Sequence, residues 1–138
     1  MMVMALLGLA VAPTLAAEID APVVTGTWMA PEGTYALEIK PCEGSLCGTI
    51  VWAEDESLIG TVVLSDLKLE ANGKGKHTDG ELADPESGKN YYRCELGVDD
   101  QGRLELEGQI GVTRRGRVVL SRFATKLHFS PAEALPAN

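Results

Sequence analysis

Few residues of this chain have the type and spacing that catalysis or metal binding requires. The histidines His77 and His128 are far apart and neither has a second histidine nearby, so neither a metal site nor a general base is indicated. Residues 73–76 alternate glycine and lysine but lack the spacing and following helix of a phosphate-binding loop. No serine or cysteine stands in a nucleophile elbow. The sequence therefore predicts no catalytic residue, no metal and no cofactor.

The cysteines are the most reactive side chains of the chain. Cys42 and Cys47 flank residues 43–45, a turn-like stretch, so a disulfide between neighbouring strands is geometrically feasible. Closing so short a loop stabilises by only about 2 kcal/mol. Two unpaired thiols are the alternative, and zinc is not indicated because no second cysteine pair or histidine cluster completes four ligands. We predict a Cys42–Cys47 disulfide and a buried, unpaired Cys94.

A Gly-x-Trp motif, from Gly26 to Trp28, begins the first predicted strand. In barrels of the lipocalin and avidin type, a Gly-x-Trp at this place plugs one end, and a basic residue of the last strand covers the indole. The matching residue is Arg122, which shares parity with Val118 and Leu120. An arginine over a tryptophan face gains about 1 kcal/mol or more. We expect Gly26, Trp28 and Arg122 to close the barrel, which is a structural role.

Further aromatic residues are candidates to line a ligand site: Tyr35, Trp52 and Tyr92. Trp52 has the parity of Ile50, which favours core packing and leaves ligand stacking as the alternative. Tyr91 and Tyr92 must face opposite sides of their strand. Because Tyr92 aligns with Cys94, we predict that Tyr92 is the tyrosine in the interior.

Short strands separated by turns account for most of the chain. Residues 34–40 and 103–110 alternate apolar and polar side chains, which places one face in water and the other in a core. Weaker runs of the same kind occupy residues 24–30, 46–53, 61–70, 80–84, 90–98 and 117–124. The short turns between them join neighbouring antiparallel strands. We therefore predict an all-β fold, an antiparallel up-and-down barrel of about eight strands of the lipocalin or avidin type.

The side chains expected to face the barrel interior follow from this alternation. They are Trp28, Tyr35, Leu37, Ile39, Ile50, Trp52, Val63, Leu67, Leu69, Tyr92, Leu96, Leu104, Leu106, Val118 and Leu120. An eight-stranded barrel is just wide enough either to be filled by such side chains or to hold one small ligand.

The first 17 residues contain no charged side chain and end in small residues that suit a signal-peptidase site before Glu18. No basic segment precedes this apolar run, and a buried N-terminal helix is the alternative. The run is too short to cross a bilayer comfortably, and nothing after residue 20 is long enough to be a transmembrane span. We expect a signal peptide and a periplasmic or secreted protein.

The predicted division of the chain has four parts. Residues 1–17 form the signal peptide, 18–23 a linker, 24–124 the barrel domain and 125–138 a loose C-terminal tail, for which a short helix is the alternative. The net charge is −8, and no run of five or more basic residues is present. A nucleic-acid partner is therefore not indicated, and an anionic membrane surface is disfavoured on the same ground. We expect a monomer.

Several segments together resemble a known bacterial family. They are residues 60–68, 80–91 and 104–111, with residues 26–28 and 47–52 upstream. The most specific piece is the block of Asp84, Pro85, Gly88, Lys89 and Tyr91. With these segments, the chain resembles the bacterial domain of unknown function family numbered 2147 over about residues 24–123. The resemblance implies an exported, lipocalin-like barrel and implies no reaction.

The chain departs from this family pattern in two places. Members commonly carry a long insertion after the strand that ends near Trp52, where this chain has only residues 53–59. Their closing strand usually contains W-x-R, where this chain has Ser-Arg-Phe at residues 121–123. If the long loop forms a ligand mouth in relatives, that mouth is altered here.

Three functions remain open at this point. The first is non-enzymatic binding of a small apolar or amphipathic molecule by the barrel. The second is an envelope protein-interaction or inhibitor module that engages another protein through its loops or outer face. The third is an enzyme of unrecognised type. A hollow interior would favour the first, a solid core the second, and clustered carboxylates with raised pKa values the third.

Overall fold

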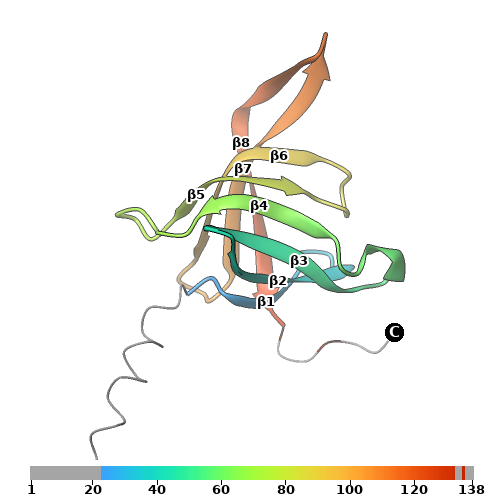
Figure 1. Cartoon of the computed structure of the whole chain (residues 1–138), viewed down its shortest axis with the longest axis vertical. Coiled ribbons are helices and arrows are strands. Elements are labelled where there is room, and N and C mark those ends of the chain that lie inside the picture. Colours follow the sequence, from blue (N-terminus) through green and yellow to red (C-terminus); the bar gives the residue numbers. More distant parts are fainter. Residues whose placement is uncertain (1–22, 133–134, 136–138) are drawn as a thin grey trace, which may run out of the picture.

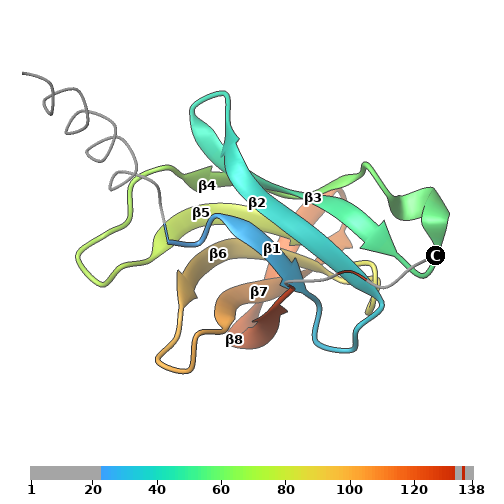
Figure 2. The same ribbon diagram turned by 90° about the horizontal axis from the view of Figure 1, so that it is seen from below.

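The computed structural model describes residues 23–132 and 135, which form a closed β-barrel (Figures 1 and 2). The strands are β1 (Gly26–Met29), β2 (Tyr35–Cys42), β3 (Ser45–Ala53), β4 (Val62–Lys68), β5 (His77–Ala83), β6 (Asn90–Val98), β7 (Leu104–Arg114) and β8 (Arg117–Pro131). Each strand pairs antiparallel with the next, and β8 returns to β1. The predicted up-and-down barrel is confirmed. The predicted signal peptide, residues 1–17, and residues 18–22 of the predicted linker lie outside the described residues.

A short 3-10 helix, η2 (Glu56–Leu58), lies in the connection between β3 and β4. Asp55 caps it, because its Oδ1 accepts hydrogen bonds from the Ser57 backbone N–H at 3.1 Å and the Ser57 hydroxyl at 2.6 Å. Within residues 23–132, no helix is long and apolar enough to cross a membrane.

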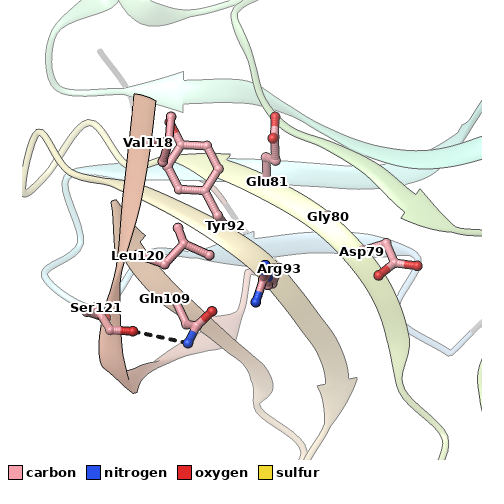
Figure 3. Close-up of a pocket in the computed structure, with 9 residues that line it drawn as sticks. All are labelled: Asp79, Gly80, Glu81, Tyr92, Arg93, Gln109, Val118, Leu120 and Ser121. Atoms are coloured by element: carbon pink, nitrogen blue, oxygen red, sulfur yellow. Dashed lines mark hydrogen bonds between the residues drawn. The ribbon is translucent and has the colours of Figure 1, made fainter. Parts of the chain in front are cut away.

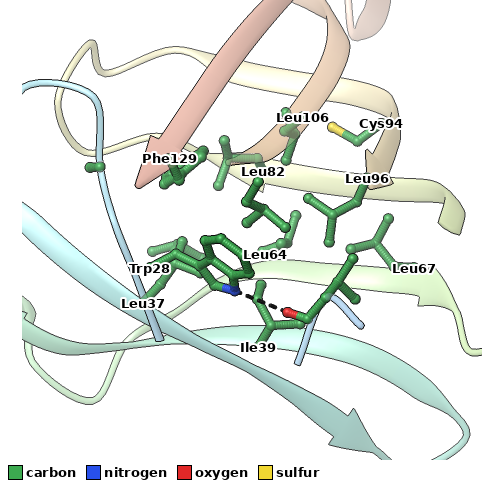
Figure 4. Packing of buried hydrophobic residues seen from close by; sticks show 14 of the residues in the cluster. Trp28, Leu37, Ile39, Leu64, Leu67, Leu82, Cys94, Leu96, Leu106 and Phe129 are labelled. Atoms are coloured by element: carbon green, nitrogen blue, oxygen red, sulfur yellow. Dashed lines mark hydrogen bonds between the residues drawn. The ribbon is translucent and has the colours of Figure 1, made fainter. Parts of the chain in front are cut away.

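Side chains from all eight strands fill the interior of the barrel (Figure 4). The largest fully buried ones are Tyr35, Phe129, Leu37, Ile39, Leu46, Ile50, Leu64, Leu67, Leu82, Leu96, Leu104 and Leu106. Tyr35 and Phe129 pack edge to face, with ring centres 6.3 Å apart. Leu69, which was predicted to face inward, is only partly buried. The interior is a packed core, one of the two states open to a barrel of this size.

A β-bulge in β6 reverses the predicted orientation of its tyrosines. Arg93 has a φ of 53°, and the register of β6 against β7 shifts between Tyr92 and Glu95. The extra residue allows Tyr91 and Cys94, three positions apart, both to lie in the core. Tyr92 therefore lies on the outer side of the strand, partly buried, and its predicted place in the interior is wrong.

Strand β8 is longer than the sequence pattern indicates. It continues to Pro131, where it pairs with β1 opposite Trp28. The predicted end of the barrel at residue 124 is therefore wrong, because residues 125–131 are strand rather than a loose tail or a helix. Residues 126–130 alternate polar and apolar side chains, and the segment pairs with β7 as far as Phe129 and with β1 at Ser130 and Pro131.

The predicted disulfide between Cys42 and Cys47 is present in the β2–β3 hairpin. The two Cα atoms are 6.1 Å apart, within the range that a disulfide spans. Cys94 is unpaired and buried in the core, as predicted. Burial raises the pKa of the Cys94 thiol to about 12, so the thiol is neutral and unreactive near neutral pH.

The raised pKa of Cys94 predicts a loss of stability in alkali. The unfolded thiol titrates near pH 9.0 and the folded thiol near about pH 12. The stabilisation is therefore complete below pH 9.0 and is lost as the pH rises toward about 12, because the unfolded chain releases its proton first. We expect Cys94→Ala to flatten this part of the pH dependence, measured by urea unfolding. An unchanged slope in the variant would contradict the assignment.

Candidate functional site

Strands β7 and β8 extend beyond the barrel as a two-stranded hairpin (Figure 1). Its rungs pair Gly111 with Leu120, Val112 with Val119, Thr113 with Val118 and Arg114 with Arg117. Arg115 and Gly116 form the turn, and both have positive φ, 50° and 77°. Two such residues are what a type I′ hairpin turn requires. Val118 and Leu120, which were predicted to face the barrel interior, therefore lie outside it.

An irregular segment of β8 marks the base of this hairpin. Gln109 pairs with Ala124, whereas the next rung pairs Gly111 with Leu120, so β8 holds two extra residues at this point. The Gln109 side-chain Nε2–H donates to the Ser121 carbonyl at 3.1 Å and fixes the bulge to β7. Beyond this bulge the hairpin extends past the barrel (Figure 1).

A cleft lies between the hairpin and the outer side of β5 and β6 (Figure 3). Its volume is about 710 Å³. The lining residues are Asp79, Gly80, Glu81, Tyr92, Arg93, Gln109, Val118, Leu120 and Ser121. The charged members are solvent-exposed on the outside of the strands, so the cleft is a feature of the outer surface and not of the interior.

The cleft joins an apolar wall to a charged floor. Tyr92, Val118 and Leu120 lie close together on one side, and Glu81 and Arg93 lie across from them (Figure 3). Aromatic and aliphatic side chains can pack against an apolar group, while the carboxylate and guanidinium can pair with polar groups. The arrangement suits an amphipathic molecule.

Two of the three predicted ligand-lining residues lie elsewhere. Tyr92 lines the cleft, but from the outer side of the barrel rather than from the interior. Tyr35 is buried in the core. Trp52 is 9% exposed and pairs opposite Ala36, and its indole Nε1 has no hydrogen-bond partner among the described residues. The burial of Trp52 agrees with packing rather than ligand stacking, but Trp52 is not a member of the core cluster that it was predicted to join.

The predicted closure of the barrel by Trp28 and Arg122 is only half right. Trp28 is buried, and its Nε1–H donates to the Val24 carbonyl at 3.0 Å (Figure 4). Gly26, with a φ of 137°, begins β1 beside it. Arg122, however, is exposed at the base of the hairpin, nine positions before Pro131, the residue that pairs with Trp28. The arginine is displaced because β8 continues well past the predicted end of the barrel.

Comparisons with known proteins agree with this architecture. A family model described as "Uncharacterized protein conserved in bacteria (DUF2147)" matches residues 26–119. The chain belongs to the DUF2147 family. Protein HP1028 from Helicobacter pylori, described as belonging to the lipocalin family, has a similar structure, with a TM-score of 0.53 at 15% identity over 80% of this chain and 83% of that chain. No curated protein matches the chain.

These findings establish a lipocalin-like barrel for this member of the DUF2147 family, and the structural likeness extends to the fold alone. They also confirm the family resemblance found in the sequence. The Asp84–Tyr91 block, which carries most of that resemblance, can now be placed in the structure.

In this DUF2147 chain, the block forms the turn between β5 and β6 around a buried aspartate. The Asp84 Oδ1 accepts hydrogen bonds from the Tyr35 hydroxyl at 3.0 Å and the Glu86 backbone N–H at 3.2 Å. Its Oδ2 accepts from the Ser87 hydroxyl at 2.9 Å. Burial, followed by the charge of Asp84 and its hydrogen bond, raises the pKa of Tyr35. Asp84 is therefore a structural anchor.

The other members of the block complete the same turn. Pro85 follows the anchor, and Gly88 has a φ of 71°, a conformation that favours glycine. The Gly88 N–H donates to the Asp84 carbonyl at 2.8 Å. Lys89 is exposed, whereas Tyr91 is buried in the core. These roles are structural, and none of these side chains lines the cleft below the hairpin.

The turn between β5 and β6 is also hydrogen-bonded to the loop between β1 and β2. The Glu86 Oε2 accepts hydrogen bonds from the Thr34 hydroxyl at 2.7 Å, the Thr34 backbone N–H at 3.3 Å and the Glu32 backbone N–H at 3.2 Å. Two loops far apart in sequence are thus joined at one end of the barrel.

Two glycines of the segment 104–111, which is part of the family resemblance, make room for side chains of β6. A Cβ atom at Gly108 would lie 2.8 Å from the Cys94 Sγ, and one at Gly111 would lie 2.5 Å from the Tyr92 Cε2. A side chain at either glycine would therefore force the neighbouring side chain of β6 to move. Gly111 therefore allows the Tyr92 ring to rest against the base of the hairpin, where it forms part of the cleft wall.

A polar cluster that the sequence did not indicate lies where β7 and β8 pair. His128 Nε2 is 3.2 Å from Glu105 Oε2, and the potential ligand atoms of Asp99, Glu105 and His128 lie within 4.8 Å of one another. Lys76 donates to Glu105 at 3.2 Å and is the main cause that lowers the pKa of Glu105. Arg103 donates to Asp99 at 3.0 Å. Because both carboxylates already have cationic partners, we interpret the cluster as an ion-pair network.

Proposed function

We propose that this protein is a non-enzymatic binding protein that holds a small amphipathic molecule in the cleft below the β7–β8 hairpin. The observation that supports this most strongly is the cleft itself. Its volume of about 710 Å³ lies within the usual range of small-molecule sites, about 300–1,000 Å³. Its wall of Tyr92, Val118 and Leu120 faces charged and amide side chains, as an amphipathic ligand requires.

The proposal places the ligand outside the barrel because the interior is filled. A ligand at the centre would have to displace fully buried side chains such as Leu37, Ile50 and Leu106. Displacing packed core side chains costs several kcal/mol, on the order of 2–5 for each leucine-sized group. The outer cleft requires no such displacement.

Export is a part of the same proposal. The Cys42–Cys47 disulfide supports it, because disulfides persist in oxidising compartments such as the periplasm and the extracellular space. The apolar first 17 residues support it as well.

The proposal can be tested with anilinonaphthalenesulfonate (ANS), whose aromatic rings and sulfonate match the two sides of the cleft. We expect its fluorescence to rise on binding and Leu120→Glu to weaken binding by roughly tenfold or more, because a carboxylate would replace the apolar wall. Val119→Glu is the matched control, since Val119 is the next residue but does not line the cleft. Equal losses in both variants would contradict the proposal.

A second candidate function, binding another protein, is favoured by two observations: the packed interior, which was the expected sign of this function, and the free edge of β8. Among the described strands, β8 meets β1 only at Ser130 and Pro131, so residues 117–129 have no strand on that side. Such an edge can accept an extended segment of another protein through main-chain hydrogen bonds. Cross-linking from Lys126, which lies in this segment, would capture that partner.

A further inference from the structure

The tip of the β7–β8 hairpin concentrates positive charge on an acidic protein. Arg114, Arg115 and Arg117 fall within four consecutive positions, at the end of the hairpin farthest from the barrel (Figure 1). All three are exposed and have no ion-pair partner among the described residues. The whole chain has a net charge of −8, so the rest of it carries −11. Three positive charges are therefore gathered at the tip, whereas the rest of the chain is acidic.

Apolar side chains accompany these arginines on both faces of the hairpin. Val112 is 51% exposed and Val119 44% exposed, and they form one rung and share one face. Val118 is 50% exposed and belongs to the opposite face. Phe123, at the bulge below, is 78% exposed. Exposed apolar side chains that lie close to one another can mark an interaction site, and the Val112–Val119 rung lies within two residues of the arginines.

The net charge of the whole chain disfavours an anionic membrane surface, but the exposed arginines at the tip lie apart from the acidic barrel. We propose that the hairpin tip is a docking element for a membrane surface rich in anionic lipid head groups. The arginines would contact the phosphates, and the valines would enter the boundary between head groups and acyl chains. A basic residue near an anionic surface contributes on the order of a fivefold gain in affinity. The three arginines together give a gain in affinity on the order of a hundredfold, and the burial of apolar side chains adds to this gain.

The length of the hairpin keeps the acidic barrel away from such a surface. From Gly111 to the turn, each strand adds about four residues, or about 13 Å at about 3.3 Å per residue. The Debye length at physiological ionic strength is about 8 Å. Repulsion between the barrel and the lipid is therefore largely screened when only the tip makes contact.

The form of the tip favours a lipid surface over a protein partner. Val118 lines the cleft, so the exposed Val112–Val119 rung is the apolar part of the hairpin that a partner can cover. The three arginines flank a turn at the free end of the hairpin, so a lipid surface that receives this end can reach all of them at once. Contact with the acidic barrel of a second copy would be head to tail and would not close, so it would lead to open chains of molecules.

Vesicle co-sedimentation of the full chain tests this proposal. We expect binding to vesicles of equal parts phosphatidylcholine and phosphatidylglycerol, little binding to pure phosphatidylcholine, and a decrease as salt is raised above about 0.15 M. The Arg114→Gln, Arg115→Gln, Arg117→Gln variant should bind the anionic vesicles on the order of a hundredfold more weakly. Val112→Ser with Val119→Ser should weaken binding without any change of charge.

The matched control removes three exposed cations elsewhere. Lys40→Gln, Lys74→Gln, Lys89→Gln gives the same net charge as the tip variant and should change binding by less than about threefold. Equal losses in the two variants, or equal binding to pure phosphatidylcholine, would overturn the proposal. The proposal would also be overturned if the tip variant bound vesicles as well as the unmodified protein does but no longer formed a complex with an acidic protein. ANS binding in the cleft should be unchanged by the tip variant, so the two proposals fail separately.

Discussion

Replacing Trp28 with alanine is expected to lower the free energy of unfolding by about 3–5 kcal/mol. The indole is buried where β1 meets β8, and its N–H is bonded to the Val24 carbonyl. Truncation would leave a cavity at the closure of the barrel and would leave a buried carbonyl without its donor. Urea unfolding followed by circular dichroism measures the change.

Arg122→Ala is the informative partner for this variant. Because Arg122 is exposed and far along β8 from the strand pair that holds Trp28, its removal should change the stability by no more than about 0.5 kcal/mol. The two substitutions should be additive within about 0.5 kcal/mol. A clear coupling energy between them would show that the arginine covers the indole and that the observed register of β8 is wrong.

Asp84→Ala should have the second large effect, a loss of about 2–4 kcal/mol. The buried carboxylate accepts hydrogen bonds from Tyr35, Glu86 and Ser87, and its loss would leave the buried Tyr35 hydroxyl without a partner. Ser87→Ala, which removes one donor at a more exposed position, should cost less, about 0.5–1.5 kcal/mol. Urea unfolding at neutral pH would measure both losses of stability.

A double-mutant cycle with Tyr35→Phe isolates the contact. Since the Tyr35 hydroxyl and the Asp84 carboxylate are bonded directly, we expect a coupling energy of about 1–3 kcal/mol. Independent effects of the two substitutions would mean that the family block does not anchor the core through Asp84.

The sequence was sufficient for the fold because the strands alternate apolar and polar residues. The clearest case is β7, where Leu104 and Leu106 are buried and Glu105 and Glu107 are less so, as the period of two predicts. The disulfide followed from local geometry, since five positions across a turn bring Cys42 and Cys47 together.

The alternation failed wherever the backbone departs from a regular strand. The bulge at Arg93 shifts the parity of β6 by one residue, so Tyr92 faces outward although Cys94 faces inward. Non-glycine residues with positive φ have no reliable sequence signal, and the pattern could not place this one.

Of the residues that line the cleft, the sequence indicated only Tyr92 as a ligand-lining residue, and the reason is non-local. Leu120 and Tyr92 come from strands that are not neighbours in the barrel, and they meet because the β7–β8 hairpin bends at the bulge beyond Gln109. The arginines at positions 114, 115 and 117 are visible in the sequence. Their position away from the barrel depends on how far β7 and β8 continue beyond the end of β6.

The central claim is that the ligand site lies outside a solid barrel, and chemical-shift mapping tests it most directly. Isotope-labelled protein is titrated with ANS while its amide signals are recorded. We predict that the shifts centre on Tyr92, Gln109 and Leu120 in the cleft. The core amides of Leu37 and Leu106 should hardly move. Shifts centred on those core residues, with the cleft unchanged, would place the ligand inside the barrel and contradict the account.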